Sequence, residues 1–279
     1  MQDLERATIL VTGATDGLGR RVAAALAERG ATVLLHGRSE ERLEATSGEI
    51  GRATGSEKPR YYLADLSSLG DVRALAGRIL SEEERLDALV NNAGVFSRDR
   101  RKSQDGYELT FAVNHLSHFL LTRLLLPLLC DSAPTRVVNV ASAGQSPIDF
   151  DDPMLEKGYD AMRAYSVSKL AQIMFTFELA ERLPDAGVMA NALHPASLMD
   201  TKMVGEAFGY TMSTVEEGAE ATVRLAASPE LEGVTGRYFD GEREARANRQ
   251  AYDERARDRL WTLSEDLCGP FLEPIPHRS

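Results

Sequence analysis

A tyrosine and a lysine in one short segment have the spacing needed for proton transfer. Tyr165 and Lys169 lie near the start of a long helical pattern, in the run Tyr-Ser-Val-Ser-Lys, and residues four apart share one face of a helix. A free phenol has a pKa of about 10, which is too high for easy proton exchange near neutrality. A neighbouring ammonium favours the phenolate. The pair therefore predicts that Tyr165 is an acid/base and that Lys169 makes it usable.

Ser142 and Asn114 are candidates for the same site. Ser142 follows the apolar run 136–141, at the edge of a predicted strand where a bound carbonyl should lie, and its hydroxyl can hold the substrate oxygen. Asn114 falls in the apolar helical pattern 107–129, where an amide indicates a structural water or a proton path. Taken singly, the four residues also have ordinary interpretations: Tyr165 as a surface contact, Lys169 as a solvated helix residue, Ser142 as a turn or cap, and Asn114 as a satisfied core amide.

Three glycines follow the first apolar run in the spacing G-x-x-x-G-x-G. They are Gly13, Gly17 and Gly19, between a predicted strand at 8–12 and a predicted helix at 19–29. Glycines let the backbone turn tightly and approach a pyrophosphate, and the N-terminus of the next helix favours negative charge. This position predicts a dinucleotide-binding loop. The alternative is a glycine turn that only reverses the chain.

The end of the second predicted strand distinguishes the two nicotinamide dinucleotides. An NAD site usually has Asp or Glu about 20 residues past the glycines, to bind the ribose 2′-OH. Here the strand ends Leu-His-Gly-Arg at 35–38, and the Arg38 guanidinium matches phosphate oxygens, which favours NADP(H) over NAD(H). Two observations oppose this choice. Arg38 could pair with Glu40 or Glu41, for which Arg42 competes, and the Asp16 carboxylate could repel a phosphate near the ribose.

The elements that must position these residues alternate along the chain. Short β-branched runs lie at 8–12, 31–35, 60–64, 88–91, 136–141 and 188–193. Longer helical patterns lie at 19–29, 39–53, 71–83, 107–129, 161–183 and 214–226. Such alternation predicts an α/β protein, a Rossmann-like doubly wound parallel sheet with helices on both faces. Ligands of these sheets bind at the carboxyl ends of the strands.

Bulk composition limits the classes of protein. With 279 residues, 43% hydrophobic and 27% charged, the chain is expected to form a single domain, 1–279, without structural metals or disulfides. A net charge of −11 argues against a nucleic-acid partner. Cys130 and Cys268 lack metal-site spacing and favour a reducing cytoplasm. The N-terminus lacks signal-peptide features, and the longest apolar run, 120–130, is below the ~20 residues that span a bilayer, so no membrane span is expected.

Two segments near the C-terminus have separate predictions. Residues 242–279 form a charged extension, whose amphipathic part at 242–267 is interpreted as a terminal helix packed on the domain, with a partner-binding tail as the alternative. Residues 201–213, which contain Met203, Phe208, Tyr210 and Met212, are interpreted as a substrate lid or, equally, as simple packing of a loop and helix.

Combined in this order, these residues resemble the short-chain dehydrogenase/reductase family, from position 8 to about 201 and more loosely beyond. The resemblance implies that Asn114, Ser142, Tyr165 and Lys169 form a catalytic tetrad. It also implies that Asp65 and Leu66 touch adenine and that Lys169 binds the nicotinamide ribose. The cofactor residues expected from the loop and the resemblance are Gly13, Thr15, Asp16, Gly17, Leu18, Gly19, Arg38, Asp65, Leu66, Asn92, Ala93, Gly94, Tyr165, Lys169, Pro195, Leu198 and Thr201.

Two departures from the family pattern bear on the substrate. The family usually has Pro-Gly after the sixth strand, whereas this chain has Pro195-Ala196 and an altered spacing to Thr201, which puts the nicotinamide contacts there in doubt. The segment between Ser142 and Tyr165 is longer than is commonest, and 147–153 could form one substrate wall. That segment and 259–265 resemble the retinol dehydrogenase-like branch, but substrate identity is not carried over.

The function expected is an NADP(H)-dependent oxidoreductase that interconverts a carbonyl and an alcohol of a small, moderately apolar molecule. Hydride would reach the carbonyl carbon as Tyr165 protonates its oxygen and Ser142 stabilises the developing charge. The alternative is a catalytically silent dinucleotide-binding regulatory or scaffold protein. A dehydratase or epimerase would need a sugar-nucleotide domain for which no room remains after Leu193. Helices at 116–129 and 173–183 could form homo-oligomer contacts, as the resemblance suggests, or serve the core.

Overall fold

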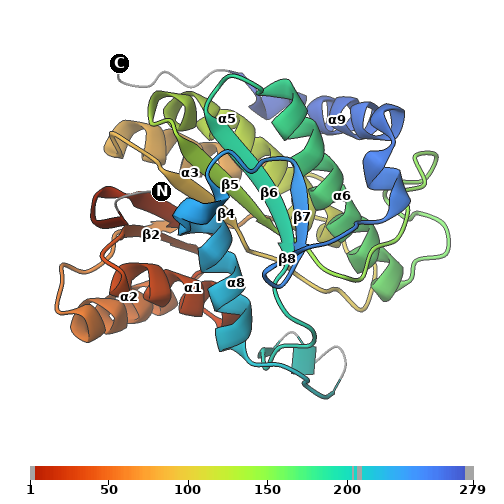
Figure 1. Cartoon of the computed structure of the whole chain (residues 1–279). Helices are drawn as coiled ribbons and strands as arrows, with labels where there is room; N and C mark the ends of the chain where they lie inside the picture. The colour runs from red at the N-terminus through yellow and green to blue at the C-terminus, as the bar shows by residue number, and fades with distance from the viewer. Residues whose placement is uncertain (1–3, 203, 206–208, 274–279) are drawn as a thin grey trace.

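The centre of the molecule is an eight-stranded sheet in the order β3-β2-β1-β4-β5-β6-β7-β8 (Figure 1). The computed structural model describes residues 4–202, 204–205 and 209–273. The strands are β1 (Thr8–Val11), β2 (Thr32–Gly37), β3 (Tyr61–Leu63), β4 (Ala88–Asn91), β5 (Thr135–Val140), β6 (Val188–His194), β7 (Arg237–Asp240) and β8 (Arg243–Glu244). All pairs are parallel except β7 with β8. The predicted doubly wound parallel sheet is confirmed, and its order reverses between β1 and β4, where such sheets bind ligands.

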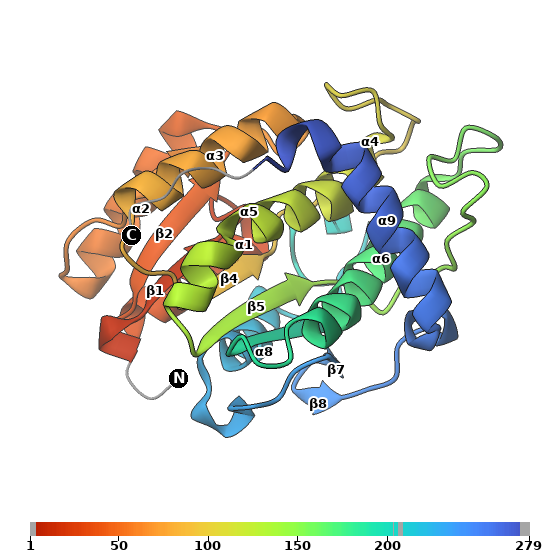
Figure 2. The same cartoon turned by 90° about the horizontal axis from the view of Figure 1, so that it is seen from above.

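Helices cover both faces of the sheet, as Figure 2 shows from above. They are α1 (Gly17–Glu28), α2 (Glu40–Thr54), α3 (Leu69–Glu82), α4 (Leu109–Phe111), α5 (Ser117–Asp131), α6 (Ala161–Arg182), α8 (Val215–Ala227) and α9 (Glu254–Cys268). Short 3-10 turns lie at Leu4–Arg6, Pro229–Leu231, Arg249–Tyr252 and Gly269–Phe271. One apolar cluster joins the sheet to α1, α2 and α8, and a second joins it to α3, α5, α6 and α9. Two buried layers therefore fix the strand ends on which the site residues lie.

The expected helix at 107–129 is interrupted near its start. Between α4 and α5 the residues Ala112–Leu116 form a π-helical turn, in which the Ser117 N–H donates to the Ala112 carbonyl five residues back. Such turns place an extra residue in a helix and are frequent at functional sites. Asn114 lies in this turn. Apolar periodicity did not reveal it, because one added residue leaves most of the helix pattern intact.

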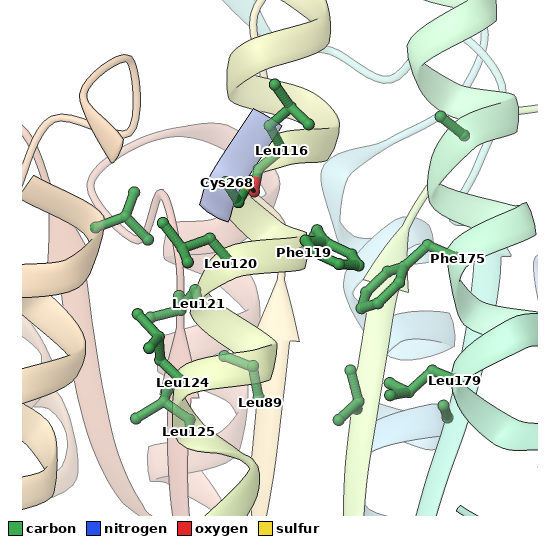
Figure 3. Packing of buried hydrophobic residues seen from close by; sticks show 14 of the residues in the cluster. Leu89, Leu116, Phe119, Leu120, Leu121, Leu124, Leu125, Phe175, Leu179 and Cys268 are labelled. Atoms are coloured by element: carbon green, nitrogen blue, oxygen red, sulfur yellow. Dashed lines mark hydrogen bonds between the residues drawn. The ribbon is translucent and has the colours of Figure 1, made fainter. Parts of the chain in front are cut away.

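The long apolar helix of the chain is part of the core. Leu109–Asp131 is long and apolar enough to cross a membrane, but 78% of its most apolar window is buried inside the protein. Figure 3 shows Phe119 of α5 directed toward Phe175 of α6, with ring centroids 5.4 Å apart, and Leu120, Leu121, Leu124 and Leu125 on the side away from α6. Burial in the core therefore explains why this helix is so apolar.

The helix α9 covers the outer side of α5 and α6. Its Trp261 ring contacts two guanidinium groups, those of Arg123 and Arg182, whose carbons are 5.0 and 4.3 Å from the ring centroid. The buried Arg257 pairs with Glu178 at 3.2 Å. The helix begins at Glu254, later than the expected 242, because β8 and a 3-10 turn precede it. This face of α5 and α6, which was a candidate for subunit contacts, is thus packed by the chain's own α9.

Candidate active site

The glycine loop joins β1 to α1 by a path that only small residues allow. Gly13 and Gly17 have φ angles of 67° and 44°, in the left-handed region. A Cβ at Gly19 would collide with the Gly13 carbonyl and with the Asn92 side-chain amide. Asp16 caps α1 by accepting the Gly17 N–H at 2.9 Å. The loop thus leads into a helix N-terminus, which is a ready anion-binding feature.

Residues after β4 hold the start of this loop. The buried Thr12 hydroxyl accepts the N–H groups of Asn92 and Ala93 at 2.9 and 3.0 Å and donates to the Val90 carbonyl at 3.3 Å. The Asn92 side chain donates to the Thr12 carbonyl at 2.8 Å. The predicted cofactor residues from Gly13 to Gly19 and from Asn92 to Gly94 therefore lie side by side, at the switch point of the sheet.

Thr12→Val is expected to destabilise the fold, because it removes one acceptor from two backbone N–H groups. Leaving a buried donor unsatisfied costs about 1–3 kcal/mol, so we expect a loss of that order in the free energy of unfolding, measured by urea denaturation. Thr12→Ser keeps the hydroxyl and is the matched control. Equal unfolding free energies for the Val and Ser variants would contradict the role given to this hydroxyl.

His36 supports the glycine loop from β2, a role that the sequence did not reveal. Its Nδ1 accepts the Gly13 N–H at 3.3 Å, its Nε2 lies 3.2 Å from the Ala64 carbonyl, and its own carbonyl accepts the Ala14 N–H at 2.9 Å. Burial lowers the pKa of His36 to about 4. The imidazole is therefore neutral near pH 7, with Nδ1 as acceptor and Nε2–H as donor.

The charges around the predicted 2′-phosphate position differ from the expected pairing. In the part of the chain that the structure describes, Arg38 is exposed and pairs with neither Glu40 nor Glu41. Arg42, expected to compete for those carboxylates, instead donates to Asp16 at 2.8 Å. The Arg42 guanidinium holds the pKa of the Asp16 carboxyl below its usual value. The carboxylate that argued against a bound phosphate is thus paired with a cation, and the Arg38 guanidinium has no ion pair with any described residue.

The remaining expected cofactor residues lie around the same edge. Asp65 and Leu66 follow β3, where the Asp65 carboxylate accepts the Ser67 N–H at 2.9 Å and Leu66 is buried. Thr15 packs against Gly37, and Leu18 is buried at the start of α1. Their positions beside β2 and the loop agree with an adenosine end of the site.

The segment after β6 approaches the loop from the other side. The Thr201 methyl lies 3.2 Å from where a Cβ of Gly17 would be, and Leu198 has a φ of 47°. Pro195 packs near Gly218 of α8. Despite Pro195-Ala196 replacing the usual Pro-Gly, Thr201 therefore still reaches the glycine loop.

The expected lid, 201–213, is described only in part, since 203 and 206–208 lie outside the described residues. Its far end returns to the segment after β6. The Met212 N–H donates to the Leu198 carbonyl at 2.9 Å, and the Asp200 N–H donates to the Ser213 carbonyl at 3.1 Å. Both ends of the segment are thus held close together.

The structure brings Ser142, Tyr165 and Lys169 together beyond the carboxyl end of β5. The Ser142 and Tyr165 side chains share a hydrogen bond, and the Lys169 Nζ lies 5.5 Å from the Tyr165 ring centroid. Burial raises the pKa of Tyr165, and the hydrogen bond with Ser142 opposes that rise. Burial lowers the pKa of Lys169 to about 7. The phenol is therefore protonated near neutrality, beside a lysine that can change its charge there.

The Asn114 side chain lies near Lys169 and forms its hydrogen bonds with Val95 and Ser168. Its Oδ1 accepts the Val95 N–H at 2.8 Å, and its Nδ2 donates to the Ser168 hydroxyl at 2.9 Å and to the Val95 carbonyl at 3.1 Å. The Asn114 amide is thus fully hydrogen-bonded within the protein, and its part in a proton path stays a prediction. By these bonds it ties the π turn to α6 and to the segment after β4.

Ser142 is held by residues that the sequence analysis missed. Its carbonyl accepts from the Gln145 side chain at 3.0 Å and from the Tyr238 hydroxyl of β7 at 3.2 Å. Gln145 in turn accepts the Asn248 N–H at 2.7 Å. The segment after β7 therefore contributes to the site. No sequence spacing signals this, since Ser142 and Tyr238 are 96 residues apart.

The predicted substrate wall, 147–153, is held near its start, and the chain is held again just beyond its end. The Gln250 side chain accepts the Ile148 N–H at 2.7 Å and donates to the Ile148 carbonyl at 3.0 Å. Arg100 donates to the Leu155 carbonyl at 3.1 Å. The Phe96 ring lies 5.9 Å from the Tyr165 ring, so an aromatic side chain borders the phenol.

The residues between the glycine loop and Lys169, around Gly13 and Gly94, are called the cradle below, and their chemistry suits a dinucleotide. A Cβ at Gly94 would lie 3.4 Å from the Asn114 Oδ1 and 3.7 Å from the Lys169 Nζ, and one at Gly13 would lie 3.0 Å from the Ala93 Cα. Glycine at these two positions lets the backbone lie close to Ala93, Asn114 and Lys169 without an intervening side chain. The donor set suits phosphate at one end and hydroxyl groups at the other.

Comparison with known proteins shows which family model, relatives and solved structures the chain matches. Residues 7–209 match the family model described as short chain dehydrogenase. Retinol dehydrogenase 13 of Mus musculus is 40% identical over 94% of this chain and 84% of its own length. Retinol dehydrogenase 14 of Homo sapiens is 41% identical over 94% and 86%. A short-chain dehydrogenase structure from Shigella flexneri, complexed with NADP, has a TM-score of 0.71 and 29% identity, covering 87% of this chain and 100% of that one.

Proposed function

The chain belongs to the short-chain dehydrogenase/reductase family and is an NAD(P)-dependent oxidoreductase acting on CH–OH and C=O groups; from this premise we propose that it uses NADP(H) and that Tyr165 is its acid/base. The observation that carries the proposal is the meeting of Tyr165, Ser142 and Lys169 beside a glycine-lined cradle. A protein that had kept only the dinucleotide fold would not need these three polar side chains at one strand end.

The roles of the residues follow from their chemistry. When bound, the dinucleotide supplies or accepts the hydride. In reduction the Tyr165 hydroxyl gives its proton to the carbonyl oxygen, and Ser142 donates a hydrogen bond to that oxygen as charge develops. The Lys169 ammonium stabilises the phenolate that remains. In oxidation the same groups act in reverse, with Tyr165 taking the alcohol proton.

Arg38 is proposed to bind the 2′-phosphate of NADP(H). Two observations support this: the guanidinium has no ion pair among the described residues, and Arg42 neutralises Asp16. Hydrogen bonds to charged groups contribute about 1.5–3 kcal/mol. Arg38→Leu is therefore expected to weaken NADPH binding by about 10–100-fold and to leave NADH binding nearly unchanged, as measured by fluorescence titration.

The matched control is Arg52→Leu, which removes an exposed arginine from α2 far along the helix from the glycine loop. This variant should bind NADPH like the wild type. The NADP(H) proposal fails if wild-type protein prefers NADH, or if Arg38→Leu and Arg52→Leu bind NADPH with equal affinity.

The substrate is proposed to be a moderately apolar alcohol or carbonyl compound. The large apolar side chains Met162, Tyr210 and Met212 are 40%, 59% and 70% exposed; Met162 lies one turn before Tyr165, and Met212 beside Leu198. Curated relatives are named retinol dehydrogenases, so retinal belongs in the test panel.

The proposed setting is a reducing cytoplasm, in which Cys130 and Cys268 stay free thiols.

The test is NADPH oxidation with a panel of apolar and polar aldehydes and ketones. We expect turnover that depends on the carbonyl compound and favours apolar members. NADPH binding without turnover on any member would favour the alternative of a catalytically silent dinucleotide-binding protein.

A further inference from the structure

A buried polar chain runs from Lys169 away from the cradle. The Lys169 Nζ donates to the Val140 carbonyl and to the Gln172 Oε1, each at 2.8 Å. The Gln172 Nε2 lies 3.0 Å from the Nδ1 of His118 on α5. Lys169 is 4% exposed, and the other two side chains are fully buried.

Hydrogen-bond chemistry fixes the direction of this chain. An ammonium only donates, so the Gln172 oxygen must face Lys169 and its NH2 group must face His118. The His118 Nδ1 is then an acceptor, so the proton of the neutral imidazole resides on Nε2. Burial and the Lys169 charge lower the pKa of His118 to about 3. His118 is therefore a neutral acceptor that keeps the Gln172 amide from turning over.

The hydrogen bonds with described residues leave one N–H of the ammonium uncommitted. Of the three donors, one is given to Val140 and one to Gln172. The Nζ also lies 3.7 Å from where a Cβ of Gly94 would be, on the side of the cradle. We propose that Gln172 is a positioning residue, held by His118, which aims the third N–H of Lys169 into the cradle. The catalytic consequence rests on the function proposed above, but the positioning itself does not.

The pKa of Lys169 reports directly on the hydrogen bond that it donates to Gln172. Its titratable neighbours are Tyr165 on α6, His118 on α5 and His194 on β6, and burial lowers the pKa of both histidines. Both are thus neutral near pH 7, where Lys169 titrates. The Gln172 oxygen stabilises the charged form of the lysine more than the neutral amine. Removing it should lower the pKa of Lys169, and replacing it by a carboxylate should raise that pKa.

The experiment is a pH titration of cofactor-free protein carrying ¹³C at the lysine ε carbon, followed by NMR. The chain has five lysines, Lys58, Lys102, Lys157, Lys169 and Lys202, so the Lys169 signal can be assigned by its absence in Lys169→Arg. Gln172→Met is expected to lower the Lys169 midpoint by about 1–2 pH units, and Gln172→Glu to raise it by about 1–3. His118→Leu, which frees the amide, should lower it by less than Gln172→Met does.

Thr176→Val is the matched control. Thr176 lies one turn further along α6, is fully buried, and donates to the Gln172 carbonyl at 2.7 Å without touching the lysine head group. This variant should lower the melting temperature and leave the Lys169 midpoint unchanged. Equal midpoints in the wild type, Gln172→Met and Gln172→Glu would overturn the positioning role, as would a shift of the same size in Thr176→Val.

Steady-state kinetics then separates this inference from the proposed function. If the wild type reduces a carbonyl compound, Gln172→Met should lose about tenfold or more in kcat. The KM for the carbonyl compound should change little, as expected for a group that acts in the chemical step. A wild type without turnover would contradict the proposed function while the NMR shifts still stood. Turnover in the wild type with unchanged NMR midpoints and kcat in Gln172→Met would remove the positioning role alone.

Discussion

Tyr165→Phe is expected to lower kcat for carbonyl reduction by about 10²–10⁴-fold, the usual contribution of a positioned acid/base, while NADPH still binds. The variant removes only the hydroxyl that shares a hydrogen bond with Ser142, and the ring can keep its contact with Phe96. Because burial raises the pKa of Tyr165, the wild-type phenol holds its proton near neutrality. Reduction should therefore slow as pH rises through that raised pKa. Initial rates and NADPH fluorescence titration measure both parts.

The control for this variant is Tyr159→Phe. Tyr159 is a second half-buried tyrosine of the same region, whose hydroxyl donates to the Ser97 carbonyl at 2.8 Å and does not reach Ser142. It should keep most of the activity. If Tyr165→Phe reduced carbonyl compounds at the wild-type rate, another group would have to supply the proton, and the assignment of Tyr165 would be wrong.

Gly19→Ala is expected to abolish measurable dinucleotide binding. The added Cβ would collide with the Gly13 carbonyl and the Asn92 amide, and neither can yield without moving the loop, since Asn92 is bonded to Thr12 at 2.8 Å. Overpacking of this kind costs about 1–3 kcal/mol. We expect a matching loss in unfolding free energy and loss of NADPH binding by calorimetry. Gly269→Ala, at a glycine with nothing within 4 Å of its Cβ position, is the control and should change neither. Wild-type NADPH affinity in Gly19→Ala would show that the loop is not the cofactor site.

The parts of the site that could be predicted are those encoded within a few residues. Tyr165 and Lys169 belong to one helix, and Gly13 to Gly19 form one turn, so spacing alone described their geometry. The doubly wound sheet followed from its apolar strand runs. The strand β7 was not predicted, because it has only four residues and two of them, Arg237 and Asp240 at its ends, are charged.

The parts that could not be predicted depend on contacts between distant segments. His36 meets Gly13 across 23 residues, and Tyr238 meets Ser142 across 96. Arg42 was near Glu40 and Glu41 in sequence, but in the folded chain its partner is Asp16, 26 residues away. The Gln172 amide carries no motif of its own, and its bond to His118 spans 54 residues. Local patterns located the proposed reacting groups, whereas the residues that contact and orient them became visible only in the fold.

Transfer of deuterium from NADPH labelled at C4 of the nicotinamide tests the central claim most directly. The wild type would be incubated with each label stereoisomer and an apolar aldehyde such as retinal, and the alcohol analysed by mass spectrometry. We expect deuterium on the carbinol carbon from one stereoisomer only, with transfer lost in Tyr165→Phe. An alcohol formed without deuterium from either label, or no alcohol from any panel member although NADPH binds, would contradict hydride transfer at this site.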